Sequence, residues 1–129
     1  MSSQERHESD QGGRLSAWSM LMTGNCIGGA SRVTVQLAIF ARFHAREGKE
    51  DAIASELREV VPRVRNEPGC VSIETFRSVR DIRLFFLHSR WVDEAAFDLH
   101  AQLSTTNRFV ERMERLIDHP FDVARTRVL

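Results

Sequence analysis

The chain has 129 residues and a mass of 14.8 kDa, which is enough for about one domain. Its 18 basic and 18 acidic residues give a formal net charge of +0. Such a chain has no general field that attracts phosphate backbones or anionic lipid, so we expect neither nucleic acid nor membrane as a partner. No apolar run approaches the roughly 20 residues of a membrane-spanning helix.

Motifs for cofactors and metals are missing from the sequence. The two cysteines, Cys26 and Cys70, lie far apart and in no spacing typical of a zinc site. There is no Gly-rich phosphate loop and no pair of histidines at i, i+4. We therefore expect no cofactor, no metal and no disulfide framework, and a cytoplasmic location.

Composition divides the chain into two parts. Five of the seven glycines fall in residues 1–32, which show no regular periodicity, so we predict a flexible N-terminal extension there and a folded domain over residues 33–129. Within the extension, residues 15–27 are apolar enough for a signal peptide, but acidic residues precede them. A mobile extension, or a true start at Met20 or Met22, is the preferred interpretation.

The first half of the domain predicts a strand followed by a helix. Residues 33–44 alternate between two faces, as a strand does. After Gly48, apolar residues recur on one helical face, with Pro62 expected to kink that helix and residues 67–69 to end it. These apolar residues are Ile53, Leu57, Val60, Val61 and Val64.

The second half predicts a hairpin, a helical segment and a last strand. Residues 71–78 and 84–91 read as antiparallel strands, because the link between them is short. Asp93 can cap a helix over residues 94–101, and Ser104 a second one that ends before Pro120. With a strand over residues 121–129, the order is βαββαβ, which predicts an α+β, ferredoxin-like fold.

The predicted sheet carries large apolar side chains on both faces. The helices of such a fold cover only one face, so the other face needs a partner. Burial against the same face of a second copy is the simplest solution, and we expect a symmetric homodimer.

His100 is the residue best suited to acid-base chemistry. It lies beside the apolar face of its short helix, and an imidazole with an ordinary pKa near 6.5 can take a proton from an acidic phenol or enol. The alternative is a partly buried histidine that bonds a backbone carbonyl. Trp91 can stack on a flat ligand or fill the core. His88 faces either a pocket or the partner subunit.

Three runs of sequence resemble the antibiotic biosynthesis monooxygenase (ABM) family, in particular its quinol-monooxygenase-like members. They are Ala41–Glu50 (ARFHAREGKE), Glu67–Cys70 (EPGC) and Arg90–His100 (RWVDEAAFDLH), followed by Phe109. The resemblance covers about residues 35–129. It implies a ferredoxin-like protomer, a dimer whose two sheets form an α/β barrel, and a pocket between each sheet and its helices.

The resemblance also implies a reaction. Relatives oxidise electron-rich phenols, anthrones or quinols with O₂, without metal or flavin, so a small aromatic or quinol-like substrate is expected. His100 would be the base, Arg90 would hold an oxyanion and Trp91 would shape the ring site. The predicted substrate-binding residues are Ile39, Ala41, Phe43, Ile73, Phe86, His88, Phe97, Asn107 and Phe109.

The chain departs from the family pattern at several positions. It has no tyrosine, and Ile73 and His88 stand where several relatives have one. Ser89 replaces a frequent glutamate, and Asn107 replaces a frequent histidine. The Asn, Trp and His of the haem-degrading branch fall on other residue types, so haem degradation is not expected. Those residues are Ala41, His100 and Met113.

Three functions therefore remain open. The first is a cofactor-independent monooxygenase acting on a quinol or polycyclic phenol. The second is a non-catalytic dimeric protein that binds a small apolar ligand, with His100 as a structural residue. The third is an isomerase or hydrolase-like enzyme acting on a small dicarbonyl, because a fold does not determine a function.

Overall fold

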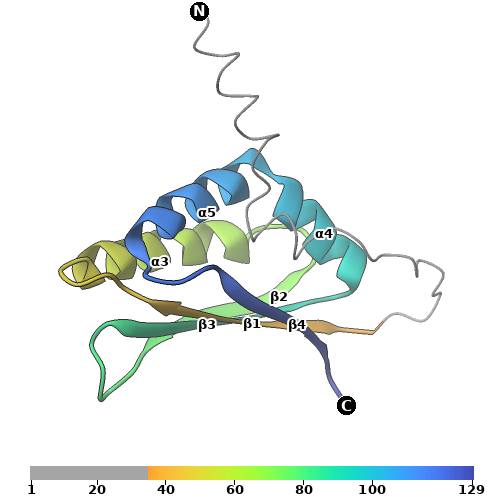
Figure 1. Cartoon of the computed structure of the whole chain (residues 1–129). Helices are drawn as coiled ribbons and strands as arrows, with labels where there is room; N and C mark the ends of the chain where they lie inside the picture. Colours follow the sequence, from red (N-terminus) through yellow and green to blue (C-terminus); the bar gives the residue numbers. More distant parts are fainter. Residues whose placement is uncertain (1–34) are drawn as a thin grey trace, which may run out of the picture. The chain divides into compact units, whose positions relative to one another are not determined.

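The computed structural model describes residues 35–129, and its strands and helices follow the predicted βαββαβ order (Figure 1). The second helical segment is divided into two helices. The elements are β1 (Leu37–His44), α3 (Glu50–Arg65), β2 (Cys70–Arg77), β3 (Leu84–Trp91), α4 (Glu94–Gln102), α5 (Ser104–Leu116) and β4 (Asp122–Arg127).

The strands form one antiparallel sheet in the order β2-β3-β1-β4. The three described helices, α3, α4 and α5, lie on the same face of this sheet (Figure 1). β2 and β3 pair as the predicted hairpin. The predicted ferredoxin-like α+β fold is therefore confirmed, whereas the assembly of two protomers into a barrel stays a prediction.

Helix α3 packs through an apolar stripe, as its sequence predicts. Its buried side chains are spaced by three and four residues, and acidic residues in the first turn and basic residues in the last turn suit the helix dipole. Pro62 lies inside α3 and does not end it, because the helix continues to Arg65. The buried side chains are Ile53, Leu57, Val60 and Val64.

Three predicted boundaries were wrong. β1 begins at Leu37, so residues 35 and 36 are not part of the strand, and β4 spans six residues rather than nine. Ser104 does not cap α5; it is the first residue of that helix. Leu103 is the C-cap of α4 and also the N-cap of α5, and its apolar side chain forms no capping hydrogen bond.

The second face of the sheet, which we call the open face, points away from the helices. Side chains on it come from paired positions of the strands, since residues paired across an antiparallel sheet share a face. Phe40, Phe76 and Phe86 lie there with 50%, 49% and 39% of their surface exposed. The predicted apolar second face is thus present in the described protomer.

Several predictions concern residues outside the described ones. The N-terminal extension over residues 1–32, its signal-like stretch and Cys26 all lie there, so these predictions stay untested. Within residues 35–129, no helix is long and apolar enough to cross a membrane. Cys70 is a free thiol, and burial raises its pKa.

Candidate active site

His100 lies in the last turn of α4, with its ring against the aromatic core. The helix is held at its start by Asp93, whose Oδ1 accepts a hydrogen bond of 2.9 Å from the backbone N–H of Ala96. The His100 ring lies 4.7 Å from the Trp91 ring and 5.4 Å from the Phe97 ring, between centroids. A short capped helix therefore places an imidazole on an aromatic surface.

A carboxylate that the sequence analysis did not select completes this arrangement. Oε1 of Glu67 lies 2.6 Å from Nδ1 of His100, and the two side chains are only 13% and 12% exposed. A carboxylate oxygen accepts a hydrogen bond from a protonated Nδ1, and Nε2 of the neutral ring then carries the lone pair. The hydroxyl of Thr106 lies 3.4 Å from the same Nδ1. The pair has the geometry of an oriented base.

Gly69 explains why Glu67 comes so close to α4. Gly69 has a φ of +86°, and a Cβ at this position would lie 2.5 Å from the Cβ of Ala96. The backbone carbonyl of Gly69 also accepts a hydrogen bond of 2.9 Å from the N–H of Val92. The turn before β2 therefore packs directly on the start of α4, which brings the preceding Glu67 within reach of His100.

Burial and charge together determine the protonation of His100. Burial lowers its pKa below the ordinary value of 6.5. Glu67 opposes this effect by its charge and its hydrogen bond, while the Arg63 guanidinium lowers the pKa further. Because the net shift is downward, the ring is neutral at neutral pH and can act as a proton acceptor.

Trp91 is part of the core as well as of the His100 surroundings. Its side chain is fully buried, and its Nε1 donates a hydrogen bond of 3.0 Å to Oγ of Ser89. The indole also meets Phe97 edge-on, with 5.6 Å between the ring centroids. Since Ser89 takes its only polar hydrogen, Trp91 contributes to the site through its ring.

The structure does not bring Arg90 to His100. Arg90 pairs with Ala38 across the sheet and lies on the open face, where its guanidinium donates a hydrogen bond of 3.3 Å to Oε1 of Gln36. Neighbouring residues of a strand point to opposite faces, so Arg90 and Trp91 diverge. Within one protomer, the predicted oxyanion-binding arginine is therefore separated from the candidate base by the sheet.

The remaining predicted substrate-binding residues fall into three groups. Phe86 and His88 lie on the open face, where the His88 ring stacks on Phe40 with 4.7 Å between the centroids. Asn107 is exposed on α5. The third group is buried in the apolar core between the sheet and the helices. It consists of Ile39, Ala41, Phe43, Ile73, Phe97 and Phe109.

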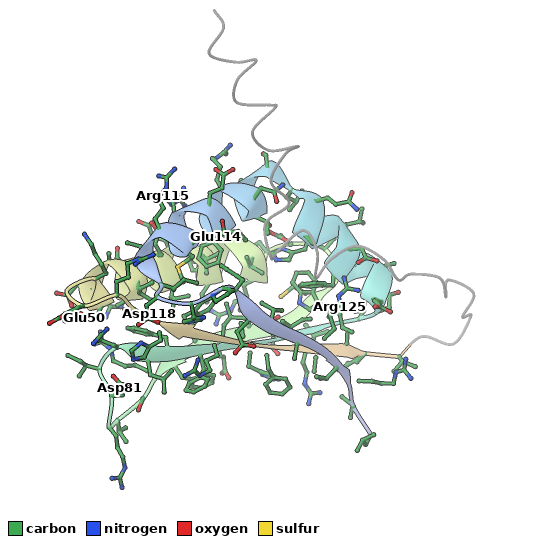
Figure 2. All side chains as sticks on the ribbon, viewed as in Figure 1. Glu50, Asp81, Glu114, Arg115, Asp118 and Arg125 are labelled. Carbon is green, nitrogen blue, oxygen red and sulfur yellow. The ribbon has the colours of Figure 1, made fainter. Side chains whose placement is uncertain are left out.

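A second histidine, His44, stands at the opposite end of β1 and forms a different polar cluster. Its Nδ1 lies 2.8 Å from Oδ2 of Asp118, and its Nε2 lies 3.1 Å from Oδ2 of Asp81, two residues that Figure 2 labels. The His44 hydrogen bond is the main reason that the pKa of Asp118 is lowered, whereas for Asp81 it is the backbone N–H of Arg83. His44 thus links the end of β1 to the β2–β3 connection and to the segment between α5 and β4. Both of its ring nitrogens are engaged, so neither is free for a substrate.

Comparison with known proteins identifies the family. The family model described as "Antibiotic biosynthesis monooxygenase" matches residues 37–112, which is more than half of the chain. The chain belongs to this family. The match contains Glu67, Trp91 and His100, so the candidate site lies within the ABM domain.

Individual relatives agree with this assignment. The chain is 28% identical over 90 residues to "Putative monooxygenase YcnE" of Bacillus subtilis (strain 168), covering 70% of this chain and 95% of that protein. The solved structure of SO0527 from Shewanella oneidensis is 28% identical, with a TM-score of 0.69 over 74% of this chain and 93% of that one. PA3566 from Pseudomonas aeruginosa is 26% identical, with a TM-score of 0.69 over 77% and 99%.

The ABM domain of this chain shows no clear metal site. In residues 35–129 there is no group of three or more His, Cys, Asp and Glu side chains arranged to hold a metal ion. Glu67 belongs to the EPGC run, which is the one sequence signal that pointed to it.

Proposed function

We propose that this ABM-family protein is a cofactor-independent monooxygenase that oxidises a quinol or a polycyclic phenol with O₂. The observation that carries the proposal is the Glu67–His100 pair, in which a carboxylate holds Nδ1 of a neutral imidazole and leaves Nε2 as a base. A histidine bonded only to a backbone carbonyl would favour a structural role, and His100 is bonded to a carboxylate instead.

The proposed reaction begins when Nε2 of His100 takes the proton of a phenolic O–H. The resulting anion is delocalised and can transfer an electron to O₂, after which the two radicals combine to a peroxide at a ring carbon that bears hydrogen. The protonated His100 returns its proton to the peroxide anion, and loss of water with the hydrogen of that ring carbon gives the quinone. One oxygen atom enters the product and the other leaves as water, so the substrate supplies all four electrons.

The surroundings of His100 support this chemistry. The buried rings of Trp91 and Phe97 surround the imidazole with apolar groups, and apolar surroundings favour an aromatic substrate over a small polar one. An apolar environment also keeps the base neutral until the substrate arrives. This argument favours the phenolic substrate over the dicarbonyl alternative.

We further propose that the functional unit is a homodimer formed through the open face. Phe40, Phe76 and Phe86 on this face are half-exposed, and burial of such residues stabilises association. Arg90 and His88 lie among them, so these two predicted site residues would be at the subunit interface rather than beside His100 of the same protomer.

Oxygen uptake tests the proposed reaction. The purified full chain is incubated with a panel of hydroquinones and an anthrone in a sealed oxygen electrode, and autoxidation without protein is subtracted. We expect uptake that falls about 100-fold in His100→Ala, as is typical for loss of a general base. Gln102→Ala, an exposed position in the same helical turn, is the control and should retain full activity.

Each other outcome has a definite meaning. Uptake that is equal in wild type and His100→Ala would keep the oxygenase and remove His100 as its base. No uptake above autoxidation across the panel would contradict the monooxygenase and favour the binding protein or the dicarbonyl enzyme.

A further inference from the structure

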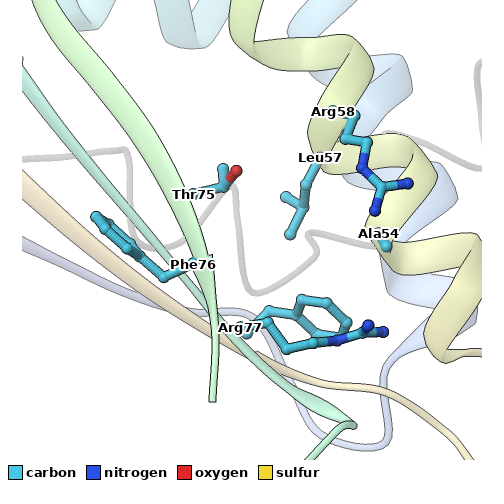
Figure 3. A pocket seen from close by; sticks show the side chains of 7 residues that line it. Ala54, Leu57, Arg58, Thr75, Phe76 and Arg77 are labelled. Atoms are coloured by element: carbon cyan, nitrogen blue, oxygen red, sulfur yellow. The ribbon is translucent and has the colours of Figure 1, made fainter. Parts of the chain in front are cut away.

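A groove between α3 and the edge strand β2 forms a second candidate site, which we call the α3–β2 groove. One part of it has a volume of about 150 Å³ and is lined by Arg58, Thr75 and Arg77, with an apolar base that includes Leu57 and Phe85 (Figure 3). A wider part of about 370 Å³ adjoins it and shares Arg58 and Thr75. His100, Glu67 and Trp91 line neither part.

The narrow part of the groove contains two cations and no carboxylate. Arg58 comes from α3 and Arg77 from β2, and Figure 3 shows the two side chains extending to the same side of the pocket. No acidic residue lines this part. The local charge is therefore positive, although the whole chain has a formal net charge of +0.

Neither arginine forms an ion pair in residues 35–129, and the carboxylate of the groove, Glu74, lines its wider part together with Arg58 and Arg65. The helix positions three and four residues from Arg58 are Ala54, Ser55, Val61 and Pro62. Arg77 faces Phe85 across the sheet, and its guanidinium carbon lies 4.7 Å from the centroid of that ring. In residues 35–129, the ion pairs of the structure involve other arginines.

The contact with Phe85 also prepares Arg77 for binding. A guanidinium that already rests on an aromatic ring has lost part of its rotational freedom, so less entropy remains to be lost when it binds an anion. Its planar N–H groups match the two oxygens of a carboxylate or the oxygens of a phosphate.

We propose that the α3–β2 groove binds a small organic oxyanion, whose carboxylate or phosphate lies between Arg58 and Arg77. The apolar body of the ligand lies along the wider part of the groove, against Val61 and Pro62 of α3. The wider part, with about 370 Å³, is large enough for a benzene ring. An aromatic carboxylate is therefore the simplest probe of suitable size and charge.

An NMR titration of the ¹⁵N-labelled full chain tests this proposal. Benzoate, inorganic phosphate and the neutral benzamide are added separately, and the backbone amides of residues 54–58 and 75–77 are followed. We expect saturable shifts with benzoate at a Kd of about 1 mM and none with benzamide. Arg58→Gln and Arg77→Gln should each raise the Kd about fivefold, because one charged hydrogen-bond donor is lost.

Arg80→Gln is the matched control, since Arg80 is exposed in the β2–β3 connection and lies outside the groove. Saturation by phosphate and not by benzoate would support the site and assign it to phosphoryl groups. Equal binding of benzamide, absence of saturation by either anion up to about 10 mM, or the same loss in Arg80→Gln would overturn the proposal. These readouts are independent of oxygen uptake.

Discussion

Oε1 of Glu67 and Nδ1 of His100 lie 2.6 Å apart, although 33 positions separate the two residues along the chain. Glu67 lies just after α3, and His100 lies in the last turn of α4. Gly69 permits the close approach of the two segments. The contact orients a ring that burial keeps neutral. It is the contact on which the proposed roles rest, with His100 as base and Glu67 as positioning residue.

Replacing Glu67 with Gln tests whether its carboxylate orients the His100 ring or only packs against it. The amide keeps the size of the side chain but loses its charge, so we expect kcat to fall about tenfold with little change in KM. Because Glu67 raises the pKa of His100, this pKa should fall further in the variant. Oxygen uptake measures the first effect, and NMR titration of the His100 ring measures the second.

Glu111→Gln is a suitable comparison for this variant, since Glu111 is an exposed acidic residue of α5. It removes the same charge and should alter neither kcat nor the His100 titration. If Glu67→Gln behaved like Glu111→Gln in both measurements, the positioning role of Glu67 would be wrong.

The pH dependence of activity follows from the protonation of His100. Only the neutral ring can accept a proton, and burial lowers its pKa below 6.5. Activity should therefore be retained at pH 6.5 and should be lost as the pH falls through the lowered pKa. A profile of kcat/KM against pH, measured on a substrate that does not ionise in this range, checks the expectation. An acidic limb centred above pH 6.5 would contradict it.

Two glycines offer a matched test of the packing between β2 and α4. Gly69 and Gly48 have φ values of +86° and +84°, but only at Gly69 would a Cβ meet another atom within 4 Å. Gly48→Ala should cost about 1 kcal/mol of unfolding free energy, from backbone conformation alone. Gly69→Ala should cost about 1–3 kcal/mol more, because of the clash with Ala96.

Urea denaturation of both variants measures this difference. The double variant Gly69→Ala/Ala96→Gly removes the Cβ on the opposite side and should recover part of the loss. Equal destabilisation by Gly48→Ala and Gly69→Ala would show that the turn before β2 is not tightly packed against α4.

The proposed dimer depends on the apolar side chains of the open face. Phe40→Asp places a charge among these side chains, so we expect this variant to be a monomer where the wild type is a dimer. Light scattering coupled to size exclusion at micromolar concentration measures both masses. Val79→Asp is the control, because Val79 is 98% exposed in the β2–β3 connection. A monomeric wild type would rule out the homodimer.

Local patterns were sufficient to predict most of the fold. Period-two alternation identified the strands, and the apolar stripe of α3 and the Asp93 cap identified two helices correctly. The limits of β1 and the start of α5 were wrong. These depend on strand pairing and on the sharp junction at Leu103, neither of which a local pattern contains.

The site was harder to predict, because its parts come from distant segments. His100 was selected for its chemistry and its place beside an apolar stripe, but its partner Glu67 lies in another part of the sequence. The expected meeting of Arg90 with Trp91 came from the family resemblance. Alternation along β3 already places these two neighbours on opposite faces, and the structure shows them there.

Arg125 connects β4, at the edge of the sheet, to the helix that carries His100. Its guanidinium forms ion pairs of 2.7 Å with Glu94 and 2.5 Å with Asp98, and lies 5.0 Å from the centre of the Phe97 ring; Figure 2 labels it beside α4. Helix α4 is thus fixed by these ion pairs to the edge strand β4, in addition to its packing on the core. The place of His100 in the fold therefore depends on a strand 25 positions further along the chain, through the ion pairs of a single arginine.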